Sequence, residues 1–587
     1  MKPTQRQSLT LLLLALVVGC KPSTPPRAPQ RREPPAPAST RDIFTDVTQV
    51  AGIRFRHVNG GFGKKYMLET MGSGCAFWDF DSDGWLDILL LNGKRLQVGT
   101  LEGANVATSR PANGPTFPPI TLALYRNNRD GTFTDVTRGS GLEVEMYAMG
   151  CAVGDYDNDG RDDVYITCVL GPSRLFRNEG NGKFREVTQQ AGVDNKGRWG
   201  SSCAWVDYDR DGWLDLFIGN YVRYRSFADD KYCSLLPGRK SYCTPQAFEG
   251  EPCTLYRNNR DGTFTDVSRS SGIADAIGKA LGVALLDYDG DGWMDIAVAN
   301  DEMPNFLFHN LRNGQFEEVG FEMGVAVGEA GNLKAGMGID ATDVTGDGTP
   351  SILISNFSHE GLSFFRLEDG MFLEVASAVG FREPSLLLLG FGLFFFDFDN
   401  DGWKDAFVAN GHVNDDIHLL YSNVTYGQRN LLFRNRGQGR FEDFSAQAGA
   451  PFREQRVSRG AAGGDYDNDG DVDILITNNN DEAQLWRNDA PRRNWLQVEL
   501  RGGKGSNRNG IGAKVRIGVG GMVQTDWVRS GSSYCSQSML RLHFGLGDAP
   551  RVDWIEVTWT NGRKQRLTNV RVNQRLTIEE AAAPSTP

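Results

Sequence analysis

Short apolar segments alternate with glycine-bearing polar turns along most of the chain. In the first unit, small apolar residues at 74–78 (GCAFW) lead into a polar turn, and a strand-like run follows at 85–90 (WLDILL). A Leu-x-Arg-Asn segment or a close variant comes next, and after a turn with glycine the unit ends in Phe-x-x-Val. The pattern predicts four short strands per unit. Four-stranded units repeated around an axis are typical of a β-propeller.

The third and fourth strands of the units can be followed by their signatures. Leu-x-Arg-Asn or a variant of it occurs at Leu124–Asn127, Leu175–Asn178, Leu255–Asn258, Leu307–Asn310, Leu432–Asn435 and Leu485–Asn488. Phe-x-x-Val occurs at Phe133–Val136, Phe184–Val187, Phe264–Val267, Phe316–Val319 and Phe372–Val375. Repeats of this size indicate stacked units that bury one another's apolar faces.

The two ends of the repeat region indicate a closed ring. No Phe-x-x-Val strand follows Leu485–Asn488, but one such strand, Phe44–Val47, stands ahead of the first unit. Pairing of these two segments would complete the last blade and remove two exposed sheet edges, whereas an open solenoid would need distinct capping units. We therefore expect an all-β chain in which residues 43–490 form a seven-bladed β-propeller.

Every unit carries oxygen-bearing side chains in the turn between its first and second strands. The motif Asp-x-Asp-x-Asp-Gly-x-x-Asp supplies Asp79, Asp81, Asp83 and Asp87; Asp155, Asp157, Asp159 and Asp163; Asp207, Asp209, Asp211 and Asp215; Asp287, Asp289, Asp291 and Asp295; Asp397, Asp399, Asp401 and Asp405; and Asp465, Asp467, Asp469 and Asp473. A weaker copy offers Asp343, Thr345 and Asp347. Oxygen-only ligands on a tight loop suit calcium. The sequence predicts up to seven calcium sites, of which the Asp343 site is the weakest.

Two other interpretations of these turns compete with calcium binding. An EF-hand loop begins similarly, but it requires a glutamate at position twelve. Position twelve is apolar here and belongs to the next strand: Leu90, Ile166, Ile218, Val298, Val408 and Ile476. The other alternative, that aspartate and glycine only form polar turns, would suit a single copy better than six complete ones.

The N-terminus has the pattern of an export signal. Lys2 and Arg6 precede the apolar run Leu9–Val18, and small residues lead to Cys20. This pattern predicts a signal peptide, and the cysteine at its end resembles a bacterial lipobox. We expect a lipoprotein signal peptide at 1–20 that ends at a lipidated Cys20. The alternative is a plain signal peptide with an incidental cysteine.

A proline-rich segment separates this signal from the repeats. Residues 21–42 (KPSTPPRAPQRREPPAPASTRD) cannot pack a core, and such a composition is typical of a semi-rigid, disordered linker. The prediction is an exported protein anchored to the membrane by its lipid, facing the periplasm or the cell exterior. After residue 20 no apolar run approaches the ~20 residues of a membrane helix.

The composition excludes one class of partner. The formal net charge of −12 and the pI near 5.2 argue against nucleic-acid binding. The 70 glycines agree with the many predicted turns.

The C-terminal part is also predicted to be β. Apolar alternation or β-branched residues mark strands at Trp495–Leu500, Lys514–Val519, Val523–Val528, Leu540–Phe544, Ile555–Trp559 and Arg575–Ile578. We expect residues 491–580 to form a small β-sandwich-like domain packed beside the ring. Residues 581–587 are predicted to be a disordered tail.

Specific motifs resemble a known family. The Gly-x-Asp-Tyr-Asp-x-Asp-Gly segments at 154–160 and 464–470 resemble the FG-GAP/VCBS repeats of integrin α-chain propellers, and this resemblance implies calcium in the loops. The segments 509–515 (NGIGAKV), 531–537 and 542–547 (LHFGLG) look like an ASPIC/UnbV domain, although 559–562 reads WTNG where Trp-Pro-Ser-Gly is expected. Together, over roughly 44–580, they resemble the bacterial branch of the cartilage acidic protein family. That resemblance implies extracellular, calcium-dependent binding or adhesion and no established reaction.

Most cysteines and histidines are expected to be structural. Cys75, Cys151 and Cys203 stand where other units carry small apolar residues, so buried packing is favoured over redox chemistry. Cys233, Cys243 and Cys253 lie in one insertion, and a disulfide is expected in an exported protein. We favour Cys233–Cys243, while the spacing leaves other pairings open. His412 is expected to be structural.

Expanded connections predict where a ligand binds. The loops at about 95–121, 223–254 and 412–429 follow second strands, so they lie on the face opposite the calcium loops. Scaffolds carry binding residues in loops, and Tyr221, Tyr224 and Phe227 are candidates. Loop growth without a binding role is the alternative.

Three functions remain open from the sequence. The first is a lipid-anchored, calcium-binding module for binding or adhesion to a protein or glycan ligand. The second is a propeller enzyme acting on an extracellular polymer such as a glycan, for which Glu69 is a candidate acid or base. The third is a scaffold or assembly lipoprotein. The chain shows no Gly-x-Ser-x-Gly elbow, and catalytic residues are not predicted.

Overall fold

The computed structural model describes residues 42–95 and 120–582. The predicted signal peptide with Cys20 and most of the linker lie outside the described residues. The same holds for most of the expanded loop at 95–121 and for residues 583–587.

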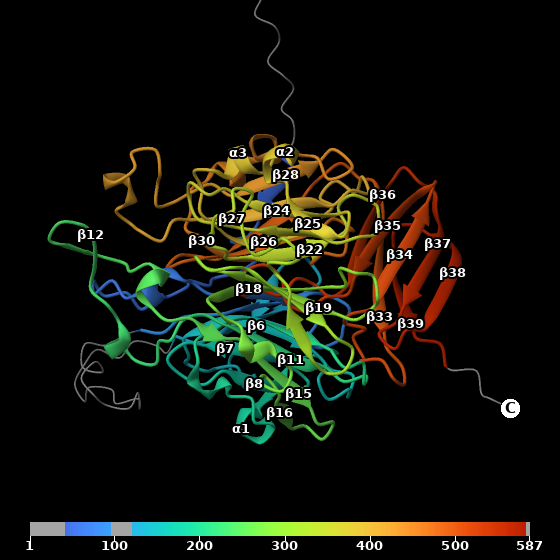
Figure 1. Cartoon of the computed structure of the whole chain (residues 1–587). Coiled ribbons are helices and arrows are strands. Elements are labelled where there is room, and N and C mark those ends of the chain that lie inside the picture. The colour runs from blue at the N-terminus through green and yellow to red at the C-terminus, as the bar shows by residue number, and fades with distance from the viewer. Residues whose placement is uncertain (1–41, 96–119, 583–587) are drawn as a thin grey trace, which may run out of the picture. The chain divides into compact units, whose positions relative to one another are not determined.

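Within the described residues, seven four-stranded antiparallel sheets follow one another along the chain, and we call them blades 1 to 7 (Figure 1). The first three contain β2 (Cys75–Trp78), β3 (Asp87–Leu90), β4 (Ala123–Asn127) and β5 (Phe133–Asp135); β6 (Ala148–Gly154), β7 (Asp163–Cys168), β8 (Arg174–Gly180) and β9 (Lys183–Glu186); and β10 (Gly200–Val206), β11 (Asp215–Asn220), β15 (Thr254–Asn258) and β16 (Phe264–Asp266).

The other four contain β18 (Ala280–Leu286), β19 (Asp295–Asn300), β20 (Phe306–Asn310) and β21 (Phe316–Glu318); β22 (Ile339–Thr342), β23 (Ser351–Ile354), β24 (Ser363–Glu368) and β25 (Met371–Glu374); β26 (Gly390–Phe396), β27 (Asp405–Asn410), β28 (Leu431–Asn435) and β29 (Phe441–Asp443); and β30 (Ser458–Gly464), β31 (Asp473–Asn478) and β32 (Gln484–Asn488), with β1 (Phe44–Asp46) as the last strand.

The blades close into a ring around their first strands. Each first strand contacts the next, in the order β2, β6, β10, β18, β22, β26 and β30, and β30 contacts β2 again. The N-terminal strand β1 pairs antiparallel with β32, with Phe44 opposite Asn488. The predicted β-propeller fold is confirmed, and the pairing of the first segment with the last blade is as the sequence predicts.

Helices are short and lie in connections. They are α1 (Thr188–Ala191), α2 (Ala376–Val379), α3 (Arg382–Ser385) and α4 (Ser445–Ala448), with 3₁₀ turns η1 (Met67–Thr70), η3 (Asn195–Gly197), η4 (Phe227–Asp229), η5 (Pro245–Ala247), η6 (Ile273–Asp275), η7 (Ile417–Leu419) and η8 (Ala450–Arg453). In the described part of the chain, no helix has the length and apolarity needed to cross a bilayer.

The C-terminal domain consists of two further sheets. Its strands are β33 (Asn494–Arg501), β34 (Lys514–Val519), β35 (Met522–Trp527), β36 (Leu542–Gly547), β37 (Arg551–Thr558), β38 (Lys564–Arg571) and β39 (Gln574–Glu579). One sheet has the order β36-β33-β39, and the other has the order β35-β34-β37-β38. Sequence reasoning did not predict β38 because this exposed edge strand is rich in charged residues, and Val570 is its one buried side chain.

A segment of the C-terminal domain enters the centre of the ring. Residues 530–539 donate to or accept from the backbone or side chains of β2, β6, β10, β22, β26 and β30. Ser533 receives the backbone N–H of Leu393 at 3.0 Å, and its hydroxyl donates to the Ala461 carbonyl at 2.9 Å. The prediction placed this domain beside the ring. The structure shows in addition that the segment at 530–539 fills the axis of the ring.

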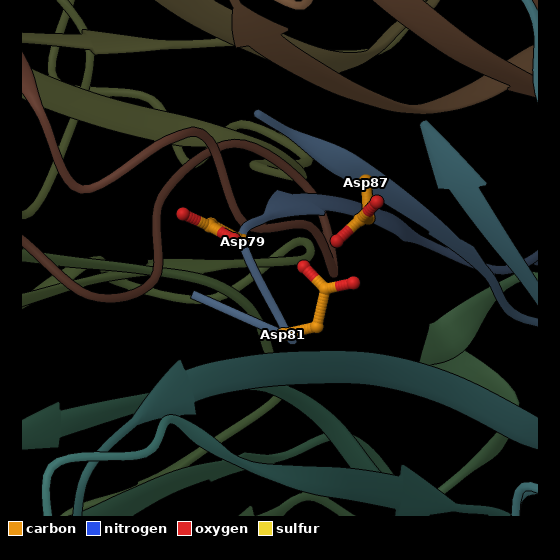
Figure 2. Close-up of side chains that lie close together, drawn as sticks. All are labelled: Asp79, Asp81 and Asp87. Atoms are coloured by element: carbon orange, nitrogen blue, oxygen red, sulfur yellow. The ribbon is translucent and has the colours of Figure 1, made fainter. Parts of the chain in front are cut away.

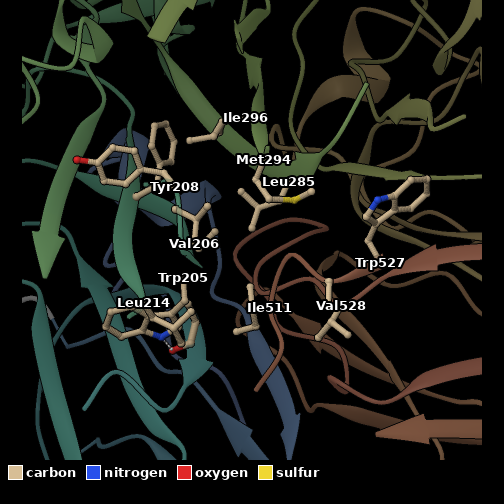
Figure 3. Close-up of a cluster of buried hydrophobic side chains, with 14 of the residues drawn as sticks. Trp205, Val206, Tyr208, Leu214, Leu285, Met294, Ile296, Ile511, Trp527 and Val528 are labelled. Atoms are coloured by element: carbon tan, nitrogen blue, oxygen red, sulfur yellow. Dashed lines mark hydrogen bonds between the residues drawn. The ribbon is translucent and has the colours of Figure 1, made fainter. Parts of the chain in front are cut away.

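Ring and C-terminal domain also share one hydrophobic core. Trp205 and Val206 of blade 3 and Leu285 of blade 4 belong to the same buried cluster as Ile511 and Trp527 of the C-terminal domain (Figure 3). Burial of apolar area contributes about 25 cal/mol per Å², so this cluster ties the two parts together.

Candidate metal centres

The aspartate loops owe their shape to hydrogen bonds from their own backbone. The first aspartate follows the first strand of the blade, and its carboxylate accepts the N–H groups of positions five and six. In blade 1, the N–H groups of Asp83 and Gly84 donate to Asp79 at 2.9 and 2.7 Å. Gly84 has φ 88°, a left-handed conformation that favours glycine. The same pair of bonds recurs at Asp155, Asp397 and Asp465.

The ninth position begins the second strand and is held from two sides. Asp87 accepts the N–H of Asn127 at 2.8 Å on one oxygen and the N–H of Phe80 at 3.2 Å on the other. Equivalent bonds to the asparagine of the third strand hold the ninth-position carboxylate of the other complete loops, Asp163, Asp215, Asp295, Asp405 and Asp473.

The asparagine of the Leu-x-Arg-Asn signature links blades, a role that sequence reasoning missed. The side-chain amide of Asn127 donates to the Tyr466 carbonyl of blade 7 at 2.8 Å, and Asn178 donates to the Phe80 carbonyl of blade 1 at 2.8 Å. Asn258, Asn310, Asn435 and Asn488 make the same bond. Each reaches the second residue of an aspartate loop in a neighbouring blade, so the loops form part of the joints between blades.

These backbone restraints bring three carboxylates together. Figure 2 shows Asp79, Asp81 and Asp87 of blade 1, with Asp81 and Asp87 turned toward one another. One oxygen of each lies within 4.8 Å of the others. Positions one, three and nine are gathered in the same way in three other blades: Asp155, Asp157 and Asp163; Asp207, Asp209 and Asp215; and Asp397, Asp399 and Asp405.

The fifth position is engaged elsewhere. Arg129 lies 2.6 Å from the Asp83 carboxylate, and Arg260 lies 2.6 Å from that of Asp211. The predicted fifth-position ligands therefore point toward arginines in blades 1 and 3, and the convergent set is the trio at positions one, three and nine.

The electrostatics of the trios call for a cation. Burial raises the pKa of Asp87 to about 9 and that of Asp79 to about 6, and the neighbouring carboxylates add to both shifts. Burial and adjacent aspartates also raise the pKa of Asp155 and Asp207 to about 7 and that of Asp397 to about 8. Crowded, desolvated carboxylates disfavour their charged form unless an opposite charge is present.

Two buried oxygens point to the same conclusion. Asp81 Oδ1 in blade 1 and Asp467 Oδ1 in blade 7 are buried and have neither a hydrogen bond nor an ion pair within the described part of the chain. The other buried carboxylate oxygens of these loops without a hydrogen bond, on Asp287, Asp291 and Asp399, lie beside cationic side chains. A buried polar atom without a partner costs about 1–3 kcal/mol. The oxygen-only trios of blades 1, 2, 3 and 6 and the unpaired oxygens of blades 1 and 7 fit a hard divalent cation.

The loop of blade 5 does not fit. Asp343 already accepts three backbone N–H groups, from Thr345, Gly346 and Gly348. Positions three and nine are Thr345 and Ser351, and Asp347 accepts the Thr349 hydroxyl at 2.6 Å. That the Asp343 site is the weakest stays a prediction, which these bonds favour.

Insertions converge on the face opposite the loops. The insertion at 223–254 contains β12 (Cys233–Leu236), β13 (Arg239–Ser241) and β14 (Glu251–Pro252), and β14 pairs with β17 (Ile277–Gly278). The disulfide Cys233–Cys243 is present, as predicted, and Cys253 is a buried free thiol. Arg239 of this insertion lies 3.2 Å from Asp416 of the insertion at 412–429. Insertions of blades 3 and 6 thus meet across the ring.

The prediction that aromatic side chains of this region are available to a ligand is wrong for two of its three residues. Tyr221 and Tyr224 are 1% and 0% exposed, because they pack around Trp199 in a central apolar cluster. The Tyr221 hydroxyl donates to Asp301 at 2.6 Å. Phe227 is half-buried. The exposed apolar side chains of the two insertions are Tyr232, Leu235, Leu419, Leu420 and Tyr421.

Glu69, the candidate acid or base, is enclosed. The residue is 2% exposed, and its carboxylate accepts the Tyr66 N–H and the Tyr242 hydroxyl, each at 3.1 Å. Burial raises its pKa. His412 is likewise buried, and its Nδ1 accepts the Asn414 N–H at 3.0 Å. Cys75, Cys151 and Cys203 are buried, in agreement with a packing role.

Comparison with known proteins identifies the repeats and the C-terminal domain. The model of the FG-GAP-like repeat matches residues 79–166, 167–218, 247–298, 287–354 and 397–476, which together exceed half of the chain, and the model of ASPIC and UnbV matches residues 503–585. Human cartilage acidic protein 1 is 25% identical over 450 residues, covering 71% of this chain and 60% of that protein. Cartilage acidic protein 1 of Xenopus tropicalis is 25% identical over 233 residues, covering 32% and 35%. The chain thus spans between about a third and three fifths of these relatives.

Solved structures with a similar fold are distant. YCF48 bound to a D1 peptide has a TM-score of 0.40 and 9% identity, covering 78% of this chain and 99% of that one. The rhamnogalacturonan lyase PL11 of Bacillus licheniformis has a TM-score of 0.34 and 12% identity, covering 71% of each chain.

Proposed function

This chain belongs to the FG-GAP-like repeat family, and from that premise we propose that it is an exported, calcium-binding β-propeller that binds a protein or glycan ligand. The observation that carries the calcium proposal is the recurrent buried trio of aspartates with unpaired oxygens. The ions would be held by positions one, three and nine of the loops in blades 1, 2, 3, 6 and 7. A bound calcium would supply the positive charge that these carboxylates lack.

Calcium binding is tested by melting. Cations that bind only the folded chain stabilise it, by about 2.7 kcal/mol per site at a hundred times the dissociation constant. We expect calorimetric melting in millimolar calcium to occur well above melting in excess chelator. Equal melting temperatures would contradict the proposal.

The ligand surface is proposed on the face opposite the aspartate loops. The C-terminal domain contacts the aspartate loops of blades 1, 2, 4, 6 and 7. The opposite face, which carries the insertions at 223–254 and 412–429, is therefore the one we propose for a ligand. Leu419, Leu420 and Tyr421 are exposed there. These three residues are consecutive, and a cluster of exposed apolar and aromatic side chains on a loop is typical of recognition surfaces.

Ligand binding is tested with a matched pair of variants. The chain from Asp42 onward, with calcium, is applied to a glycan array and to an affinity capture from the native extracellular milieu. Tyr421→Ser with Leu420→Ser should reduce capture of the partner, whereas Leu311→Ser with Met371→Ser, at exposed turns between third and fourth strands on the aspartate-loop side, should not. Equal loss in both variants, or in neither, would remove the insertion at 412–429 from the binding surface.

The export and anchoring proposals rest on separate features. The Cys233–Cys243 disulfide favours an oxidising compartment, and the pattern around Cys20 favours a lipid anchor. Expression of the full chain with a labelled fatty acid should label the native protein but not Cys20→Ser. Labelling of both proteins, or of neither, would contradict the anchor.

A further inference from the structure

The aspartate loop of blade 4 differs from the others because a lysine of the C-terminal domain reaches into it. The Lys514 ammonium lies 3.0 Å from Asp287 Oδ2, and the Asp287 side chain is fully buried. Lys514 is the first residue of β34, where it pairs with Trp527 and Thr558 on the two neighbouring strands. Its ammonium also lies 5.1 Å from the Trp527 ring centroid. The position of this charge is therefore set by strand pairing and ring contact.

At other loops the C-terminal domain brings neutral groups to the first aspartate. Gln497 donates its amide to Asp465 at 2.6 Å in blade 7. The Asn509 side-chain oxygen accepts the Asp155 N–H at 2.7 Å in blade 2. In blade 6, Gly545 faces Asp397, and a Cβ on that glycine would lie 2.0 Å from the carboxylate. One cationic residue of the C-terminal domain, Arg541, also lies near Asp79 and Asp465. The hydrogen bond described for it goes to the Asn468 side chain and not to a carboxylate.

Two more carboxylates of the blade 4 loop have cationic or proton-donating partners. Arg312 lies 2.5 Å from Asp291, which is the same fifth-position pairing as in blades 1 and 3. His309 stands where the other signatures carry arginine, and its Nδ1 lies 3.2 Å from Asp295 Oδ1. The gathered carboxylates here are Asp287, Asp289 and Asp291, without the ninth-position aspartate that joins the group in other blades.

Solvent access does not distinguish this loop. A cavity of about 340 Å³ opens beside it, lined by Asp287, Asp289, Thr349, Pro350 and Leu367 among others. A cation from solution can therefore approach the loop. Cations also pair with the third or fifth aspartate of other loops, such as Arg177 with Asp157 and Arg260 with Asp211, each at 2.6 Å. What differs in blade 4 is that the cation pairs with the first, fully buried aspartate, where an ammonium at 3.0 Å repels a second cation at the same oxygen.

We propose that Lys514 substitutes for the metal ion in the loop of blade 4, so that this loop binds no calcium while the C-terminal domain is docked. The inference rests on the proposed calcium binding of the other loops. Lys514 thereby becomes a permanent, calcium-independent attachment of the C-terminal domain to the ring, whereas the neutral contacts of Gln497 and Asn509 adjoin loops whose charge an ion must balance.

The test counts bound calcium in full-length variants at a free concentration that just saturates the native chain. Asp81→Asn and Asp289→Asn change the third position of the loops in blades 1 and 4. We expect Asp81→Asn to lose one ion per chain and Asp289→Asn to lose none. Lys514→Gln is expected to gain one ion, and Lys514→Gln with Asp289→Asn to return to the native count. Lys564→Gln, an exposed lysine of the same domain, is the control and should leave the count unchanged.

The outcomes separate this inference from the proposed function. Loss of one ion in Asp289→Asn would show that the native blade 4 loop binds calcium and would overturn the role of Lys514. No gain in a folded Lys514→Gln would overturn it as well. If Asp81→Asn also leaves the count unchanged and the native chain binds no calcium, the proposed function itself fails. Should Lys514→Gln not fold, the comparison of Asp81→Asn with Asp289→Asn still decides the question.

Discussion

A buried arginine joins three blades at the centre of the ring. The Arg459 side chain is 0% exposed and donates to the carbonyls of Thr70 at 2.8 Å, Gly411 at 2.9 Å and His412 at 3.2 Å. Its guanidinium lies 3.9 Å from the Phe391 ring centroid. Burial lowers its pKa to about 10, so it remains charged at neutral pH. Carbonyl dipoles and an aromatic face thus stabilise a cation whose described hydrogen bonds involve no carboxylate.

Removal of this guanidinium should destabilise the whole ring. Arg459→Met leaves several buried carbonyls without donors, each costing about 1–3 kcal/mol. We expect a loss of about 3–5 kcal/mol in the free energy of unfolding, measured by urea denaturation in calcium at neutral pH. Arg459→Lys should recover part of it. Arg551→Met, at a side chain that is 62% exposed, is the control and should change it by less than about 0.5 kcal/mol. Equal effects at the two sites would remove this role for Arg459.

Buried histidines set the acid limit of stability. Burial, with the charge of Arg459, lowers the pKa of His57 to about 3, and burial lowers the pKa of His543 to about 3 and that of His412 to about 4. The unfolded chain binds a proton at each of them near pH 6.5, but the folded chain does not. Their contribution is therefore fully present above pH 6.5 and is lost as the pH falls toward the folded values.

The contribution of His57 to the pH dependence of stability can be isolated by substitution. At pH 5 the neutral, buried imidazole should cost about 2 kcal/mol relative to pH 7. We expect the free energy of unfolding of the native chain to fall more steeply from pH 7 to pH 5 than that of His57→Gln. The difference between the two slopes should correspond to about one additional proton bound on unfolding. The difference between the two proteins cancels the titration of the aspartate loops. Parallel pH profiles would show that His57 is protonated in the folded state.

At the scale of the element, most strands follow from local pattern. Asp79–Asp87 with its glycine predicted a tight turn, and the structure places the turn between β2 and β3. Phe44–Val47 was assigned to the last blade because the repeat lacked a fourth strand there, and β1 pairs with β32. Such features depend on residues close in sequence or on the regularity of the repeat.

Contacts between distant elements could not be predicted in this way. Lys514 and Asp287 are more than two hundred positions apart, and nothing near either residue marks the other as its partner. Tyr221 and Tyr224 were expected on the surface because they adjoin an insertion, but the ring axis buries them. The strand β38 could not be predicted from apolar alternation, because an exposed edge strand needs few apolar residues and this one is rich in charged residues.

The closing strand gives a test at this scale. Phe44 is fully buried and packs on the rings of Phe396, Phe398 and Phe452. Phe44→Ala should cost about 3–5 kcal/mol of unfolding free energy and should expose the backbone of β1 to hydrogen exchange. Phe133→Ala, at the same position of blade 1, should destabilise the chain but keep β1 protected.

Phe321→Ala, at a ring that is 64% exposed, is the surface control for this pair. Protection of β1 in Phe44→Ala would mean that backbone pairing with β32, and not the phenylalanine, holds the ring closed.

At the scale of the whole molecule, the C-terminal domain acts as part of the ring. Its segment at 530–539 bonds to first strands from six blades, and Tyr534 donates to the Met71 carbonyl at 3.0 Å while its ring meets that of Phe391 edge-on. The C-terminal domain shares a hydrophobic core with the ring and also fills the axis of the ring. The domain therefore cannot unfold without breaking contacts of the ring itself. Stability should therefore be cooperative across the two domains.

Calorimetry distinguishes one folding unit from two. The chain from Asp42 onward should melt in a single transition in calcium, because unfolding of the C-terminal domain would expose the ring side of their common core. Tyr534→Ala, which leaves a cavity at the axis, should lower that transition without splitting it, while Tyr232→Ala, at a side chain that is 70% exposed, should leave it in place. Tryptophan fluorescence, which reports Trp527 along with the ring tryptophans, should change at the same temperature. Two separate transitions, of which Tyr534→Ala moved only one, would show instead that the ring folds without its axial segment and that the C-terminal domain is docked onto a structure already complete.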